Sequence, residues 1–107
     1  MTNTSASLLR ISSFNSNSLG DSKKRSKVLQ YFLKKNYDLT VLVDTRINPG
    51  SENSIRNEWD GQIIFNSYKS NARGILILIK KNLPLEILDT KKDEVGNTLQ
   101  ILARFDE

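Results

Sequence analysis

An amide and a carboxylate stand at matching places in the sequence, each where a predicted strand gives way to a polar segment. Asn15 follows a strand predicted over 8–14, and Asp44 follows the apolar run 39–43. If the helix between them makes these strands parallel neighbours, both side chains emerge at one sheet edge, where open α/β sheets place ligands. Their oxygens can hold a hard cation such as Mg²⁺, which would polarise a phosphoryl oxygen. The ordinary alternative is that both residues form turns with their own backbone.

The composition limits the chemistry that this chain can perform. It has 107 residues and contains neither cysteine nor histidine. A disulfide framework, thiolate zinc, a cysteine nucleophile and an imidazole base are therefore excluded. Catalysis by the chain alone would have to use carboxylates, amides, hydroxyls, lysine or arginine. The length allows one domain with a modest core.

Positive charge gathers in the first half of the chain. Residues 1–56 carry nine basic and four acidic side chains, and the net charge of the whole chain is +4. A polyanionic partner is one reading of this bias, and a solvated basic face is the commoner one. No apolar run is long enough to cross a bilayer, and the polar tail 1–7 has no signal-peptide pattern. An intracellular protein without a membrane partner is expected.

The hydrophobic pattern predicts one main helix and a series of strands. Asp21 or Ser22 can cap the helix, which ends near Asn36. The chain order predicts an α+β fold with a mixed sheet. The run 75–79 needs cover on both faces, and the chain ends directly after a strand, so a fragment of a larger domain is expected. The expected strands are 8–14, 39–43, 62–66, 74–79, 85–88 and 98–105, with a loop and one helical turn over 45–60 and a charged turn over 89–96.

Several short motifs resemble the endonuclease/exonuclease/phosphatase superfamily. The string 9–19 is similar to its opening strand–Asn–x–Asn–Gly–Leu motif, and 42–46 (Leu-Val-Asp-Thr-Arg) to its Leu–Gln–Glu–Thr–basic metal motif. The helix carrying Lys24 and Arg25 stands where the family has a basic, leucine-rich first helix. Three later segments resemble the apurinic-site-like endonucleases of non-LTR retrotransposons, and a fourth matches their acidic-glycine turn. These four are 59–61, 65–67, 73–79 and 93–99.

The resemblance implies a fold and a reaction. It implies that residues 8–107 are the N-terminal half of a four-layered α/β, deoxyribonuclease-like sandwich. It also implies DNA nicking by phosphodiester hydrolysis that depends on Mg²⁺ or Mn²⁺. The implied partners are the DNA backbone, the C-terminal half of the domain and a reverse transcriptase in the parent protein. Access to the nucleus is expected if the host is eukaryotic.

The same resemblance assigns roles to individual residues. It implies a catalytic role for Asn15, metal coordination by Asp44 and an outer-shell metal contact by Asn17. Arg46 is expected near phosphate, and Asn71 and Arg73 on a DNA-facing loop. A solubilising hairpin tip is the alternative for the last two residues. The basic helix start adds three further DNA-binding candidates, Lys23, Lys24 and Arg25.

This chain departs from the family pattern at several positions. The family has Glu where this chain has Asp44, whose side chain is shorter by about 1.5 Å. Val43 replaces the family's Gln, and Ser18 replaces its Gly. The family's later catalytic residues, including its histidine, would lie beyond residue 107. We therefore expect this polypeptide alone not to cleave DNA.

Two other function classes stay open. A superfamily relative acting on phospholipid or inositol phosphates would share the Asn and acidic motifs. A non-catalytic remnant that binds nucleic acid, or only contributes structure, would explain the Asp at position 44. The basic helix and the Trp-Asp-Gly and Arg-Gly-Ile segments favour the nuclease.

Overall fold

The computed structural model describes residues 8–106, so the polar tail predicted over 1–7 lies outside the described residues. The described chain is an α+β structure with a four-stranded sheet, a two-stranded sheet, two α-helices and one 3₁₀ turn. Its elements are β1 (Ile11–Asn15), α1 (Ser22–Lys34), β2 (Leu39–Val43), the 3₁₀ turn η1 (Pro49–Ser51), α2 (Glu52–Arg56), β3 (Gly61–Asn66), β4 (Ile75–Lys80), β5 (Leu85–Lys92) and β6 (Leu99–Phe105).

The larger sheet is mixed, as the chain order predicts. Its strand order is β1-β2-β4-β3. Strand β1 runs parallel to β2, while β4 is antiparallel to both β2 and β3. Helix α1 connects the two parallel strands. Strand β1 lies at the sheet edge, where Ile11 and Phe14 are exposed.

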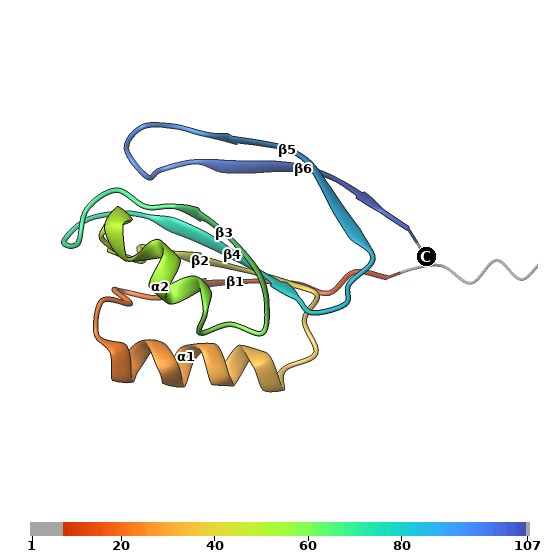
Figure 1. Ribbon diagram of the computed structural model, residues 1–107, viewed down its shortest axis with the longest axis horizontal. Helices are drawn as coiled ribbons and strands as arrows, with labels where there is room; N and C mark the ends of the chain where they lie inside the picture. Colours follow the sequence, from red (N-terminus) through yellow and green to blue (C-terminus); the bar gives the residue numbers. More distant parts are fainter. Residues whose placement is uncertain (1–7, 107) are drawn as a thin grey trace, which may run out of the picture.

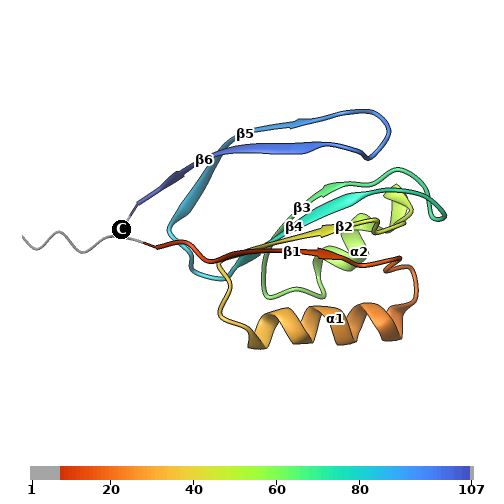
Figure 2. The ribbon, with the colours of Figure 1, turned by 180° about the vertical axis from the view of Figure 1, so that it is seen from behind.

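Cover for the apolar strand β4 comes from both sides (Figure 1). Helices α1 and α2 lie on one face of the larger sheet, and the β5–β6 hairpin lies on the other, as the reverse view also shows (Figure 2). On the helix side, Leu29 and Phe32 pack with Leu76 and Leu78. On the hairpin side, a second apolar cluster forms around Leu39, Ile77 and Ile79, with partners from β5 and β6. The expected shortage of cover is thus met by the hairpin as well as the helices.

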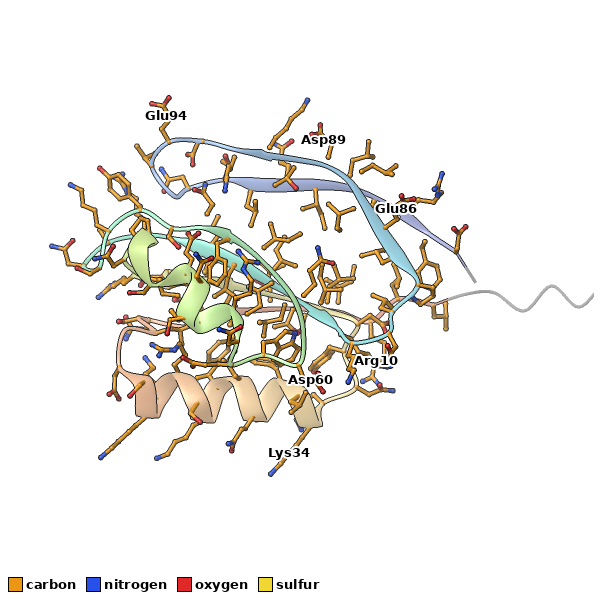
Figure 3. All side chains as sticks on the ribbon, viewed as in Figure 1. Arg10, Lys34, Asp60, Glu86, Asp89 and Glu94 are labelled. Atoms are coloured by element: carbon orange, nitrogen blue, oxygen red, sulfur yellow. The ribbon has the colours of Figure 1, made fainter. Side chains whose placement is uncertain are left out.

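Local signals for α1 act as the sequence predicts. Asp21 is the N-cap, and its carboxylate accepts a hydrogen bond of 3.1 Å from the backbone N–H of Lys24. Lys34 lies in the last turn, where a cation complements the helix dipole, and it points away from the sheet (Figure 3).

Trp59 is buried, and its indole N–H donates to the carbonyl of Ile79 at 3.0 Å. It is a core anchor.

The predicted bounds of two strands, β1 and β5, are wrong by more than one residue. Strand β1 begins at Ile11 instead of residue 8, and Asn15 is its last residue instead of the first residue after it. Strand β5 extends to Lys92, although 89–96 reads as a charged turn. The register with β6 shifts between Ile87 and Asp89, and pairing then continues to Lys92. Charged residues are tolerated there because Asp89 to Lys92 are exposed on the two-stranded hairpin.

Charge is distributed unevenly over the layers. The labelled Asp89 and Glu94 lie on the β5–β6 hairpin and point away from the larger sheet (Figure 3). Lys34 projects from α1 on the opposite side of the molecule. The β5–β6 hairpin, with these carboxylates on its outer side, therefore forms one outer layer, and the lysine-rich helix α1 lies on the other side of the larger sheet.

Candidate nucleic-acid interface

Four loops meet at one end of the molecule and form what we call the loop rim, residues 15–20, 44–46, 71–74 and 93–98. Both ribbon views place these turns at the same end (Figures 1 and 2). Backbone hydrogen bonds tie them together. The N–H of Ser18 donates to Asp44 at 2.8 Å, and that of Arg46 donates to Arg73 at 2.8 Å. The fourth loop joins through the Gly74 N–H, which donates to Gly96 at 3.1 Å.

Asn15 and Asp44 emerge at the same edge of the sheet. In the parallel β1–β2 pair, Asn15 lies opposite Val43, and Asp44 is the next residue. The Asn15 side chain is exposed, and its Oδ1 accepts the backbone N–H of Asn17 at 3.2 Å. Asn15 thus forms the local turn that was its alternative interpretation, and it lies at the sheet edge where the topology predicts it.

The Asp44 carboxylate is fully engaged by Arg46. The Arg46 Nε donates to Asp44 Oδ1 at 2.9 Å, and Nη2 donates to Oδ2 at 3.0 Å. This is the bidentate, fork-like geometry in which arginine binds carboxylates most strongly. The side chain of Asp44 is 28% exposed and that of Arg46 is 38% exposed, so the pair lies at the surface of the rim.

Left-handed backbone is concentrated at the rim. Among the described residues, six non-glycine positions have positive φ, and five of them belong to the rim. Such conformations are uncommon outside glycine and need support from the surrounding structure. Thr45, which is completely buried, separates two of these positions. The five are Asn17, Ser18, Asp44, Arg46 and Arg73.

A shallow cavity of about 240 Å³ lies beside Asp44. It is lined by Val43 and Asp44 from the end of β2, by Arg73 and Gly74, and by Asn97 from the turn between β5 and β6. Gly74 has φ of +107°, and a Cβ at this position would collide with the Oγ1 of Thr45. The close approach of these loops therefore requires glycine at position 74.

As arranged, the residues at this edge do not fit a bound Mg²⁺. The expected donors are the Asp44 carboxylate and Asn15 Oδ1. Both oxygens of Asp44 face the guanidinium of Arg46, which already neutralises the carboxylate. A divalent ion needs oxygen ligands at about 2.0–2.1 Å in octahedral geometry, so it would have to displace the arginine. Asn17, the expected outer-shell residue, is exposed and donates its N–H to Asn15.

The three basic residues at the start of α1 have different environments. Lys23 is exposed. The ammonium of Lys24 donates to the carbonyl of Asn17 at 2.7 Å, so it stabilises the first rim loop. Arg25 is only 11% exposed and forms a bidentate pair with Glu58, while its Nη1 donates to the carbonyl of Leu19. Of these three side chains, only that of Lys23 makes no hydrogen bond or ion pair within residues 8–106.

The tip between β3 and β4 combines cations with an aromatic ring, a feature absent from the sequence prediction. Asn71 and Arg73 are exposed there, which fits both a DNA-facing loop and a solubilising hairpin tip. Arg73 lies 5.3 Å from the ring centroid of Tyr68, and Lys69 lies 4.9 Å from it. These cation–π contacts hold two positive charges beside the ring at the rim. The closeness of Tyr68, Lys69 and Arg73 in the sequence was the available signal.

Asp93 organises the turn between β5 and β6. Its Oδ1 accepts the Asn66 amide at 3.0 Å and the backbone N–H groups of Asn97 and Thr98 at 3.0 and 3.3 Å. Burial raises the pKa of Asp93, but hydrogen bonds from Thr98, Asn97, Asn66 and Val95 outweigh it, and the net pKa is lowered. Asn66 is buried and also donates to the Thr98 carbonyl at 2.7 Å. This network attaches the fourth rim loop to β3.

Comparison with protein-family models and with curated protein sequences finds no match to this chain. Within residues 8–106, no helix has the length and apolar character needed to cross a membrane.

Proposed function

We propose that this chain is the N-terminal half of an endonuclease/exonuclease/phosphatase-type domain and that its loop rim binds the phosphodiester backbone of DNA. In this proposal, the complete domain has the four-layered sandwich of that superfamily and nicks DNA with Mg²⁺ or Mn²⁺. This chain contributes the backbone-binding surface. It contains no histidine, so any imidazole in the reaction comes from elsewhere.

The architecture supports the proposal. A helical layer, a mixed sheet and a facing hairpin follow one another, which is the layering expected of half a sandwich (Figure 1). The β1–α1–β2 unit with parallel strands comes first, and antiparallel strands follow. The open β1 edge is compatible with further strands from the rest of such a domain.

One observation carries the proposal. The parallel β1–β2 register delivers Asn15 and Asp44 to a common edge, as the family motifs require. The same edge carries Arg46 and Arg73, together with a cavity of about 240 Å³. An amide, a carboxylate and two guanidinium groups at one rim are suited to phosphodiester recognition.

A second candidate function is binding of nucleic acid without catalysis. The bidentate contact between Arg46 and Asp44 favours it, because the residue expected to hold the metal is already neutralised. Both candidates predict that the isolated chain binds DNA without cleaving it. They differ in the parent protein: a longer chain that nicks supercoiled plasmid only with Mg²⁺ or Mn²⁺ supports the nuclease.

The test is the salt dependence of DNA binding by the 107-residue chain. Fluorescence anisotropy with a duplex of about 20 base pairs, from about 50 to 200 mM KCl, gives the slope of log K against log salt, which falls by about 0.9 for each phosphate contact. We expect Lys23→Ala and Arg73→Ala each to reduce the slope by about one contact. The matched control is Lys34→Ala, which removes the same charge from the far end of α1.

Two results would reject the proposal. One is binding that does not depend on salt. The other is a slope that Lys34→Ala lowers as much as Lys23→Ala does, because the effect would then reflect net charge alone. An inositol polyphosphate that competes with DNA at equal phosphate concentration would redirect the assignment to the lipid-phosphate branch.

A further inference from the structure

The segment Asp44–Thr45–Arg46 has a rigid backbone. Asp44 O accepts from Ser18 N–H, and Thr45 O accepts from Leu19 N–H at 2.7 Å. Thr45 N–H donates to Gly74 O at 3.1 Å, and Arg46 N–H donates to the carbonyl of Arg73. Both ends of the segment have left-handed φ, 54° at Asp44 and 50° at Arg46. The Asp44 and Arg46 side chains therefore start from fixed positions, and only their own torsions can move.

The Asp44 carboxylate determines the orientation of the Arg46 guanidinium. It accepts from Nε and Nη2, which form one edge of the planar group. Within residues 8–106, Nη1 donates to no protein acceptor, and the side chain is 38% exposed. A guanidinium held along one edge keeps its other N–H groups available for a second oxyanion. Holding the fork in place also removes part of the side-chain entropy that binding would otherwise cost.

We infer that Asp44 is a positioning residue for Arg46 and that the arginine supplies, without a metal ion, the positive charge that receives a DNA phosphate at the rim. This inference rests on the proposed function. It explains why an Asp at this position is compatible with the site, since its carboxylate has to reach a guanidinium two residues away. It also means that DNA binding by this chain does not require a divalent ion.

The inference and simple electrostatics predict opposite effects of one substitution. Asp44→Asn removes a negative charge near the bound phosphate, so charge alone predicts tighter DNA binding. If Asp44 acts by holding Arg46, the same substitution weakens binding, because an amide oxygen holds the fork less firmly than a carboxylate does. The expected loss is about threefold, and the matched control is Asp60→Asn, an exposed carboxylate that pairs loosely with Lys81.

The experiment measures binding of the full chain to the same duplex in EDTA and in Mg²⁺. We expect binding in EDTA to be at least as tight as in Mg²⁺, because Mg²⁺ only competes as a counterion of the DNA. Arg46→Ala should bind about tenfold more weakly, with a salt slope lower by about one phosphate contact. In the Arg46→Ala background, Asp44→Asn should cause no further weakening, since Asp44 acts only through the arginine. Circular dichroism and thermal melting establish that each variant is folded. If Arg46→Ala does not fold, Arg46→Lys replaces it in the double-mutant test. Lysine keeps the charge but cannot form the fork, so the salt slope should stay near that of the wild type while Asp44→Asn causes no further weakening in this background.

Two outcomes would overturn the inference. Binding by Asp44→Asn that equals or exceeds that of the wild type would show that the carboxylate does not position the arginine. Binding that requires Mg²⁺ and loses this requirement in Asp44→Asn would return Asp44 to the metal. Either result, with salt-dependent binding intact, leaves the proposed function standing. Loss of salt dependence in the wild type rejects the proposed function itself.

Discussion

Arg25 provides the sharpest test of the structure, because its sequence position predicts a DNA contact and its surroundings indicate a structural role. The guanidinium lies in the first turn of α1 and binds both carboxylate oxygens of Glu58, each at 2.9 Å. Its Nη1 donates to the carbonyls of Leu19 and Gly20 at 2.9 and 3.3 Å. Arg25 therefore joins α1, the first rim loop and the segment between α2 and β3.

Arg25→Ala should lower the free energy of unfolding by about 2–3 kcal/mol. Removing one partner of a buried ion pair costs about 3–5 kcal/mol, and a hydrogen bond to a charged group contributes about 1.5–3 kcal/mol. Glu58 is 33% exposed and regains water, which places the effect at the lower end. For a chain of this size, 1 kcal/mol corresponds to about 4 °C in Tm, so a decrease of about 8–12 °C is expected.

The assay is chemical and thermal unfolding of four proteins: wild type, Arg25→Ala, Arg25→Lys and Lys23→Ala. Lys23→Ala is the matched control because this exposed lysine lies in the same helical turn, and it should change stability by less than about 0.5 kcal/mol. Arg25→Lys keeps the charge but loses the fork, so its stability should lie between those of the wild type and the alanine variant. DNA binding measured below the melting transition should fall for Lys23→Ala and stay unchanged for Arg25→Ala.

One result would refute this reasoning. If Arg25→Ala is as stable as Lys23→Ala but binds DNA more weakly, the arginine faces the nucleic acid and its contacts to Glu58 contribute little. A double-mutant cycle with Glu58→Ala separates the pair from the carbonyl contacts, and a coupling of about 1 kcal/mol or more is expected for this geometry.

Three further predictions concern the packing of the rim and the core. Gly74→Ala should cost about 1–3 kcal/mol in urea unfolding, because alanine must adopt a φ of +107° and its Cβ meets Thr45. Trp59→Phe should cost about 1–2 kcal/mol by the same measurement, since the carbonyl of Ile79 loses its indole donor in a buried place. The fold lowers the pKa of Asp93. Its contribution to the stability is therefore fully present above the pKa of the unfolded state, about 4, and is lost as the pH falls through the lower pKa of the folded state. Asp93→Asn should remove this part of the acid dependence in unfolding curves recorded from about pH 2 to 6.

The main elements could be predicted because their signals are local. The Asp21 cap and the apolar stripe around Leu29 and Phe32 predict α1, and the apolar run of β2 predicts a buried strand. A helix between two strands favours parallel neighbours, and this placed Asn15 and Asp44 at one edge. That part of the candidate site follows from topology alone.

The remaining features depend on contacts that sequence patterns do not report. Arg25 finds Glu58 across 33 positions of sequence, which the basic run gives no reason to expect. Arg46 folds back on Asp44 only because both residues adopt left-handed backbone, a conformation enforced by hydrogen bonds from other loops. Strand β5 continues past Asp89 because pairing with β6 outweighs the turn-like composition of its charged second half.

The β5–β6 hairpin has no backbone ladder to the larger sheet. It is held by the apolar cluster around Ile77 and by a few links at the rim, such as Asn66 to Asp93 and Lys92 Nζ to the carbonyl of Phe65. The two layers can therefore separate without breaking strand pairing in either, so the hairpin is a cooperative opening unit of its own. The amide protons of the hairpin should exchange with solvent faster than those of β2 and β4. Opening of the hairpin would expose the face of the larger sheet that carries Ile77 and Ile79, and it would leave the helical side intact.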